Sequence, residues 1–582
     1  MSCLSAVLLL GLGACGGGGS GDGGNASPDV LAPQVESQTP ADGANAVALD
    51  AAVTVRLDEA IDPASVSPGS VRLARNGTPV AGATVLLADG RTVAFTPAAE
   101  LDRGLSYQAT LAGTVTDSAG NALGGDTTWN FTTGRFGPAA LVAHAEGEGP
   151  LWNAPANLVV GPDGTGTYAY SDYTAGHERM AVYRHDAGTG WSLDAQFPGL
   201  SGFPALAIDG AGRVLLVSTQ FDSATGSYQL LARFRDPVSG WQARSVLVST
   251  PNSIFEIDLA VAPGGRAAVL WRELTHSMGD GELRSAMYES GTGWGAPESL
   301  PNHSDAMGFP HKWPAGGRIA VDDNGVAAAR WAEIDHNCCS FLGWSDVLAR
   351  YTPGSGWDAF VPTIGSDPIG TSAPDHAPAI EILPGGATSL SVRMVHRSAD
   401  GQAHPAGTLY DLPGNTLTWE YIDGYSPATP DPWLPEYAMD PRSAMDAVGN
   451  VLLLWSRNNH GQVLNADLVS RVYVNGVGYE PLAPVAPPVE GTISQPVLAG
   501  APDGSALAAW LLWDGEATSV YATRRVPGQA WDPVQRLVSL PGSNRIRGLA
   551  IGFGANGAGQ VAWEEPAPAP SRAYAIRASR FE

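Results

Sequence analysis

Ile319-Ala-Val-Asp-Asp-Asn-Gly325, Val347-Leu-Ala-Arg-Tyr351 and Gly356-Trp357 belong to a pattern that returns along the chain. An apolar strand enters a turn rich in Asp, Pro and Gly. A second strand, a third strand carrying Arg or Tyr, and a Gly-Trp pair follow. The Gly-Trp pair, or a degraded copy of it, recurs every 50 to 63 residues. A period of this size, with alternating apolar residues and almost no helical pattern, predicts a β-propeller, an all-β fold.

The first strand and its turn occur in eight copies, at 158–164, 206–212, 259–265, 319–325, 380–386, 445–449, 498–504 and 551–557. Eight copies predict eight blades within residues 136–582, and the irregular repeat between Ile380 and Trp419 leaves seven as the alternative. The last third strand, at 574–580, has no Gly-Trp strand of its own. We expect residues 139–144, which precede the first repeat, to pair with it and close the ring by strand exchange.

Tryptophan often ends the second strand of a repeat. A Trp at one fixed place per repeat is expected to fill the gap between neighbouring blades, with its N–H bonded to the backbone. We therefore interpret these residues as core rather than as a sugar-stacking platform. They are Trp271, Trp331, Trp455, Trp510 and Trp563.

Residues 32–134 form a separate unit with short period-two strands, such as 53–57 and 107–111, between Gly-containing turns. This pattern predicts an antiparallel sandwich. Pro40-Ala-Asp-Gly43, the run 57–66, Phe95-Thr-Pro97 and the closing Trp129-Asn-Phe131-Thr-Thr-Gly134 resemble the SbsA-type bacterial Ig-like domain. The resemblance implies a spacer or adhesion module without catalytic residues.

Asp117 and Asn121 lie in a Gly-containing turn of this unit, Thr116-Asp-Ser-Ala-Gly-Asn121. We interpret the pair as part of a tight turn. A Ca²⁺ loop is the alternative, and no other cofactor is predicted.

The N-terminus reads as a targeting segment. The apolar run 4–12 is too short to span a membrane, and it ends in Leu12-Gly-Ala-Cys15. This tetrad resembles the lipobox of bacterial lipoproteins. The resemblance implies a signal peptide at 1–14, lipidation of Cys15 and a Gly/Ser-rich tether at 15–31. We expect export to the outer membrane or cell surface and anchoring in the membrane by lipid. A plain secretory signal cut near Ala14 is the alternative.

The net charge and the cysteines of the chain limit the partners and the chemistry that can be expected. The 582 residues carry a net charge of −26, which disfavours nucleic acid as a partner. Once Cys3 is removed and Cys15 is lipidated, only the adjacent Cys338 and Cys339 remain of the four cysteines. In an oxidising compartment this pair can close a vicinal disulfide, which we interpret as a locally rigid turn. A redox or ligand-gripping role is the alternative.

Unusual side chains gather in the fourth repeat, where we place the candidate ligand-binding residues. Their spacing matches no metal motif, so no metal site is predicted. They are His303, Asp305, His311, Asp335, His336 and Trp344.

Two functions follow for this chain, which we expect to be a monomer. One is a non-catalytic surface lipoprotein whose propeller binds an extracellular glycan or protein. The other is a surface polysaccharide hydrolase or lyase with its site in the propeller funnel. Paired carboxylates converging on the funnel would favour the enzyme, and a funnel without perturbed acids would favour the binding protein.

Overall fold

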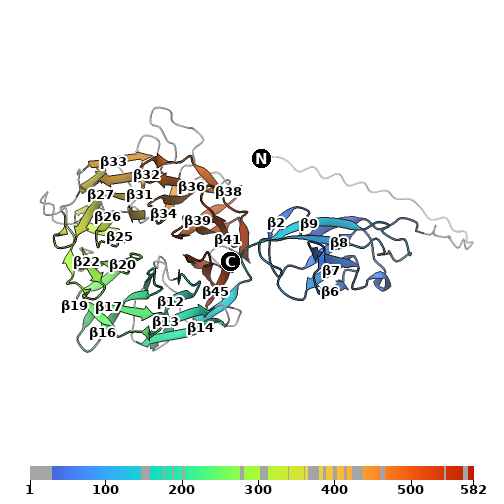
Figure 1. The fold of residues 1–582 in the computed structure, drawn as a ribbon, viewed down its shortest axis with the longest axis horizontal. Coiled ribbons are helices and arrows are strands. Elements are labelled where there is room, and N and C mark those ends of the chain that lie inside the picture. Colours follow the sequence, from blue (N-terminus) through green and yellow to red (C-terminus); the bar gives the residue numbers. More distant parts are fainter. Residues whose placement is uncertain are drawn as a thin grey trace, which may run out of the picture. The chain divides into compact units, whose positions relative to one another are not determined.

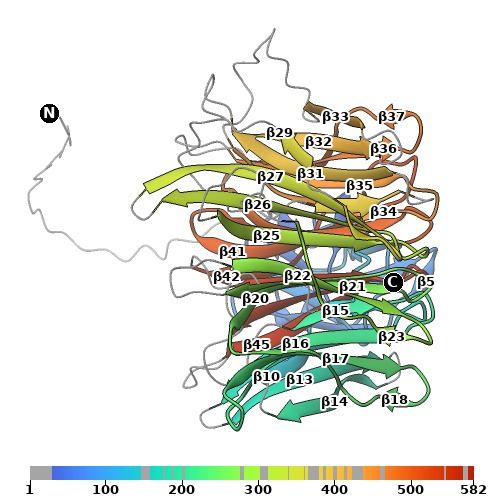
Figure 2. The same cartoon turned by 90° about the vertical axis from the view of Figure 1, so that its left-hand side faces the viewer.

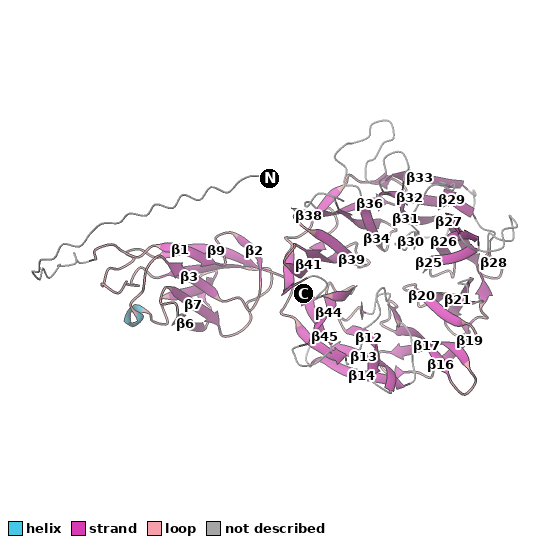
Figure 3. Ribbon diagram, turned by 180° about the vertical axis from the view of Figure 1, so that it is seen from behind, coloured by secondary structure: helices cyan, strands magenta, loops and turns pink. Residues whose placement is uncertain are grey.

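The computed structural model describes residues 29–145, 158–174, 177–186, 189–198, 204–274, 281–301, 312–337, 340–358, 361–364, 379–383, 388–396, 403–411, 416–421, 437–458, 466–542, 546–567 and 574–581. The chain folds into two compact units. The first holds residues 1–43, 51–99 and 107–131, and the second holds 44–50, 100–106 and 132–582. The described residues are almost entirely strands and turns (Figure 3), and none forms a helix long and apolar enough to cross a membrane.

Two antiparallel sheets account for the N-terminal strands. One has the order β1-β3-β7-β6 and the other β2-β9-β8-β4-β5. Inward residues such as Val53, Val55 and Leu57 are fully buried, as the period-two pattern predicts. The elements are β1 Val35–Thr39, β2 Ala44–Val47, β3 Val53–Leu57, the 3-10 turn η1 Pro63–Ser65, β4 Val71–Arg75, β5 Thr78–Pro79, β6 Gly82–Leu86, β7 Thr92–Pro97, β8 Ser106–Leu111 and β9 Thr127–Thr133.

The strands from β10 onward form a series of antiparallel meanders. The first three meanders follow chain order. Their bounds are β11 Leu158–Val160, β12 Gly166–Thr174, β13 His177–Asp186 and β14 Gly190–Pro198; β15 Ala205–Ile208, β16 Val214–Asp222, β17 Ser227–Asp236, β18 Gly240–Trp241 and β19 Ser245–Thr250; and β20 Ser253–Val261, β21 Ala267–Leu274, β22 Gly281–Glu289, β23 Gly293–Trp294 and β24 Glu298–Ser299.

The next meander contains the longest strands of the chain, β26 and β27. Two meanders after it share one nine-stranded sheet through a single parallel pair, Ala403 with Tyr437. The bounds are β25 Lys312–Val321, β26 Ala327–Asn337, β27 Ser340–Thr352, β28 Gly356–Trp357 and β29 Val361–Ile364; β30 Ala379–Ile382, β31 Thr388–His396, β32 Ala403–Asp411 and β33 Thr416–Tyr421; and β34 Tyr437–Met445, β35 Val451–Asn458, β36 Ala466–Val474, β37 Gly478–Tyr479 and β38 Ala483–Val489.

The last two sheets include the pairing expected from the sequence. Strand β10 from the start of the series pairs antiparallel with β45 at its end, with Ala140 opposite Ala578. The sheet order is therefore β10-β45-β44-β43. The bounds are β39 Thr492–Gly500, β40 Ala506–Trp513, β41 Ala517–Arg525 and β42 Gln535–Pro541; and β43 Arg547–Phe553, β44 Gly559–Pro566, β45 Tyr574–Phe581 and β10 Ala140–Ala145.

The meanders of the C-terminal unit stand around a circle, as seen in Figure 1. Their first strands contact one another in chain order, β11, β15, β20, β25, β30, β34, β39 and β43, and β43 in turn contacts β11. The Gly-Trp strands β18 and β23 and the Gly-Tyr strand β37 all lie at one end in Figure 2, which we name the turn face. The opposite end, where each second strand finishes, is the loop face.

Glycine fixes the turn after the first strand in seven of the eight repeats, those whose turns the structure describes. The Gly161 N–H donates to the Thr165 carbonyl at 2.8 Å, and the Gly164 N–H donates to the Gly161 carbonyl at 2.9 Å. This is a three-residue hairpin loop whose last residue must be left-handed, which only glycine adopts without strain. Seven glycines have φ between 80° and 88° at this place: Gly164, Gly212, Gly265, Gly325, Gly449, Gly504 and Gly557.

The Gly-Trp pair follows a second hairpin turn, across which its glycine is paired, and its Trp joins neighbouring meanders. The glycines Gly190, Gly240, Gly293 and Gly356 have φ between 73° and 89°. The Trp357 indole N–H donates to the Ser285 hydroxyl of the preceding meander at 2.8 Å. The expectation of backbone partners concerns the tryptophans that end the second strands, and it is wrong for two of them. The indole N–H groups of Trp331 and Trp563 donate to the Glu333 and Glu565 carboxylates, at 3.4 and 3.1 Å.

The tryptophans that end the second strands are core residues, as predicted. Each is at most 2% exposed and packs between adjacent sheets: Trp271, Trp331, Trp455, Trp510 and Trp563.

Candidate functional site: acids on the first strands

Apart from β34, which also meets β32 through one parallel pair, each first strand has only one neighbour in its own sheet, so its other edge carries N–H groups that the sheet does not bond. Three acids on these strands whose side chains the structure describes form the candidate site, and we call them the first-strand carboxylates. Glu256 and Asp258 lie on β20, and Glu381 lies on β30. None of the three was predicted from the sequence, although a carboxylate between apolar residues, as in Ile380-Glu381-Ile382, is a readable signal.

Glu256 occupies a β-bulge. Its φ is +49°, unusual for a residue with a side chain, and the register with β21 shifts between Phe255 and Asp258. The bulge turns the carboxylate toward β25, where it accepts the Gly316 N–H at 3.0 Å. The Arg272 guanidinium lies 3.2 Å from the same carboxylate. Glu256 thus joins its own sheet to the next one.

Asp258 makes a second joint between the same strands. It accepts the Ile319 N–H at 2.8 Å, and the Arg318 guanidinium lies 3.6 Å away. Burial raises the pKa of Asp258, while Arg318 and the backbone N–H bonds act in the opposite direction. Two free N–H groups of β25 are therefore satisfied by acids of the preceding repeat.

Glu381 repeats this joint further along the circle. Its carboxylate accepts the Ser443 hydroxyl of β34 at 2.8 Å. Burial raises its pKa to about 7, which the bond from Ser443 partly offsets. A carboxyl group that titrates near neutral pH can donate or accept a proton under physiological conditions.

A fourth acid, Glu564 on β44, is more deeply buried. It is 1% exposed, and burial raises its pKa to about 8 against the pull of Arg547, whose Nε lies 3.5 Å away. Arg547 also lies over the Tyr574 ring, 3.8 Å from its centroid. At this burial Glu564 cannot reach a polymer without local opening, so we leave it outside the candidate site.

The candidate residues from the sequence are only partly placed. His303, Asp305, His311, Cys338 and Cys339 lie outside the described residues. Asp335 and His336 end β26 and Trp344 lies on β27, with Asp335 opposite Gly343 and Ile334 opposite Trp344. The backbone therefore brings these three positions together at the loop-face end of one hairpin, and their side chains are outside the description. The disulfide and ligand roles stay predictions.

Asp117 behaves as the turn interpretation requires. Its carboxylate accepts the N–H groups of Ala119 and Asn121 at 2.8 Å each and the Asn121 side-chain amide at 2.8 Å, and these bonds lower its pKa against its burial. Asp29 and Glu59 offer carboxylate oxygens within 4.8 Å of it, a spacing that a cation could bridge. Only Asp29 of the three is exposed, and Asp117 is buried. Acids also gather in this way without an ion, so the Ca²⁺ alternative stays a prediction.

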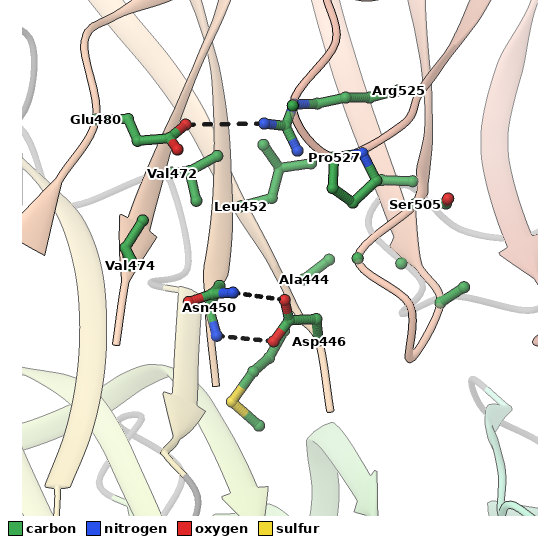
Figure 4. Close-up of a pocket in the computed structure, with 16 residues that line it drawn as sticks. Ala444, Asp446, Asn450, Leu452, Val472, Val474, Glu480, Ser505, Arg525 and Pro527 are labelled. Atoms are coloured by element: carbon green, nitrogen blue, oxygen red, sulfur yellow. Dashed lines mark hydrogen bonds and ion pairs between the residues drawn. The ribbon is translucent and has the colours of Figure 1, made fainter. Parts of the chain in front are cut away.

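Two cavities open on the turn face. One, of about 90 Å³, lies between the meanders of β34–β38 and β39–β42, and in it Glu480 and Arg525 face each other at 3.9 Å (Figure 4). The other, of about 250 Å³, lies between those of β20–β24 and β25–β29. Both are lined by the same hairpins of their repeats, around Gly504 and Gly325 respectively. They are therefore products of the repeat geometry rather than a unique site.

Comparison with known proteins identifies one part of the chain. Residues 29–133 match the family model of a bacterial Ig-like domain. A comparison with curated proteins gave no match.

Solved structures resemble the fold at a distance. The polysaccharide lyase Uly1 is 11% identical, with 75% of this chain and 92% of that chain covered and a TM-score of 0.39. The β-propeller domain of the trilobed protease from Pyrococcus furiosus is 6% identical, with 69% and 97% covered and a TM-score of 0.36. The GH93 α-L-arabinofuranosidase of Fusarium graminearum is 11% identical, with 55% and 93% covered and a TM-score of 0.35. These likenesses are too distant to transfer an activity.

Proposed function

We propose that this chain is a bacterial surface lipoprotein in which an Ig-like spacer carries an eight-bladed β-propeller that binds a glycan or a protein. The eight first strands that contact one another in series support the blade number. The β10–β45 pair supports closure by strand exchange. The Leu12-Gly-Ala-Cys15 tetrad supports the lipid anchor.

We favour a binding function over a catalytic one because the first-strand carboxylates are already hydrogen-bonded within the fold. Glu256, Asp258 and Glu381 each bond to the next first strand, at 3.0, 2.8 and 2.8 Å. An acid that holds two strands together is not free to meet a substrate. Recognition then falls to the loop face, because loops on a rigid scaffold are where binding residues concentrate.

Binding of the full chain to immobilised polysaccharides and surface proteins tests the proposal. Replacing Trp344 by Ala at the loop face should weaken binding about tenfold, the loss expected for an aromatic anchor. The matched control is Val238→Ser, because Val238 is 96% exposed on a turn-face hairpin. Equal loss in both variants, or no ligand in the panel, would count against loop-face binding.

The anchor has its own test. Cys15→Ser should release the protein from membranes into the soluble fraction, because the thiol is the proposed point of lipidation. Retention of the variant in membranes would show that another segment anchors the chain.

A second candidate, a surface polysaccharide hydrolase or lyase, is favoured by one observation. The Glu381 pKa of about 7 suits a general acid or base. Incubation with acidic and neutral polysaccharides, followed by assays for new reducing ends and for unsaturated products, tests it. Activity that Glu381→Gln abolishes while the fold is retained would replace the binding proposal.

A further inference from the structure

An arginine with no counter-ion in the described part of the chain lies between two meanders. Arg233 on β17 is 8% exposed, and its Nη1 has no hydrogen-bond partner among the described residues. Its guanidinium lies over the Phe197 ring of β14, 4.4 Å from the ring centroid. A buried charge is costly unless an opposite charge compensates it, and a cation–π contact compensates only part.

Neighbouring arginines are compensated. Arg235 alternates onto the same face of β17 and bonds Asp194 through two nitrogens, at 2.8 and 3.1 Å. In the turn beside it, Arg213 bonds Asp209 at 2.7 Å. The fold therefore supplies carboxylates to arginines in this region, and the residues that the structure describes supply none to Arg233.

The surroundings of Arg233 are positive and carry a free polar group. Burial lowers its pKa, and the charge of Arg244 lowers it further. Arg244 is exposed and is bonded to Gln220 at 3.2 Å. The Ser218 hydroxyl is fully buried without a hydrogen-bond partner in the described ranges, and Ser218 alternates onto the same face of β16 as Leu216, which is paired with Arg233. The charge of Arg244 lowers the pKa of Asp222, so Arg244 has an acid nearby. Arg233 has no ion-paired acid in those ranges, in a chain with a net charge of −26.

We propose that this seam, formed by Phe197, Ser218, Arg233 and Arg244, binds an oxyanion, namely the carboxylate or sulfate group of an acidic glycan. Phe197 holds the guanidinium plane and leaves its N–H edge for the anion, which a planar guanidinium grips through two bonds. Arg244 is held by a single long bond and meets the arriving anion first. No residue of the seam lies on a strand that carries a first-strand carboxylate. Only the polymer that bears the anion depends on the proposed glycan binding.

Anion-dependent stabilisation of the full chain tests the site. Thermal unfolding is followed in low-millimolar sodium sulfate, sodium glucuronate and sodium chloride at matched ionic strength. Sulfate or glucuronate should raise the melting temperature above that in chloride, and the arm with the larger effect identifies the anion. Arg233→Gln should weaken the apparent affinity about tenfold, as loss of a charged hydrogen bond predicts.

The controls separate a site from general salt effects, since sulfate also stabilises proteins by exclusion from their surface. Arg536→Gln removes an exposed charge from another meander and should leave the response unchanged. Arg244→Gln, whose side chain is exposed, should weaken the affinity several-fold and serves if the Arg233 variant does not fold. Equal responses to all three salts, or an unchanged response in both Arg233→Gln and Arg244→Gln, would overturn the proposal. Free anions acting without any polysaccharide bound would uphold the seam and count against glycan binding.

Discussion

The meander of β20–β24 meets its two neighbours through different chemistry. Toward β15–β19 the seam is aromatic, with the Phe234 and Tyr288 centroids 4.5 Å apart and those of Tyr288 and Trp294 5.4 Å apart. Toward β25–β29 the seam is polar, with Glu256 and Asp258 bonded to backbone N–H groups of β25. The same repeat backbone thus accepts either joint, and a few side chains decide which one forms.

The hydrogen bonds of the Gly-Trp indoles also differ between the two seams. Trp357 donates to Ser285 and Trp531 to Ser470, and both serines occupy the same place on the third strand of the preceding meander. Ala232 holds that place before Trp294, whose buried indole nitrogen has no partner among the residues that the structure describes. The aromatic seam therefore lacks, in this described part, a hydrogen bond that the polar seam has.

Removing a core tryptophan should give the largest loss of stability, and the loss should be similar in the aromatic seam and in the polar seam. Trp271 is fully buried in the aromatic seam, so Trp271→Ala should lower the free energy of unfolding by about 3–5 kcal/mol. Trp331→Ala, in the core of the polar seam, should cost a similar amount in chemical denaturation. A large difference between the two variants would mean that the seams differ in apolar packing and not only in polar joints.

The polar joints should make stability depend on pH. The pKa of Glu381 is raised to about 7 from 4.5, so the folded protein holds this proton through a range in which the unfolded chain releases it. Its contribution to stability is therefore greatest below pH 4.5 and falls by about 1.4 kcal/mol per pH unit up to pH 7.

Chemical denaturation across this pH range measures the slope. Glu381→Gln should remove the part of the slope that the titration of Glu381 contributes. Ser443→Ala removes a bond that favours the ionised form, so it should raise the Glu381 pKa further and extend the fall in stability to higher pH. A slope unchanged in both variants would exclude Glu381 as its source.

Breaking one polar joint should have an intermediate effect. Asp258→Ala leaves the Ile319 N–H without its acceptor and should cost about 1–3 kcal/mol. Asp258→Asn keeps an oxygen acceptor and should cost less. The two variants are compared by thermal unfolding, and equal losses would assign the effect to the charge rather than to the hydrogen bond.

Adding the missing hydroxyl should give the smallest effect, and it should be a gain. Ala232→Ser places an acceptor where Ser285 stands before Trp357, and should stabilise the fold by about 0.5–1.5 kcal/mol. Ser285→Ala should lose a similar amount. If Ala232→Ser does not stabilise the fold while Ser285→Ala destabilises it, the aromatic seam holds Trp294 in a different position from that of Trp357.

Features that depend on backbone geometry could be predicted from the sequence. Left-handed turn positions demand glycine, so Gly164 and Gly325 marked the hairpins, and the missing last strand marked the β10–β45 pair. Features that depend on contacts across a seam could not. The residue in the bulge at position 256 is a glutamate and not a glycine, so the sequence does not indicate the bulge. The lack of a described partner for Arg233 becomes visible only when two meanders are packed together.

The β10–β45 pair also sets the order in which the chain can fold. Ala140 must wait for Ala578, which a ribosome delivers only after all the intervening meanders, so this sheet cannot nucleate with its local neighbours. Each doubling of such a loop adds only about 0.6 kcal/mol to the entropic cost, so the delay is kinetic rather than a burden on stability. A chain cut short before β45 leaves β10 and β44 as two open strand edges. Those edges distinguish an unfinished molecule from a finished one, and they are the surfaces on which chaperones or proteases would act.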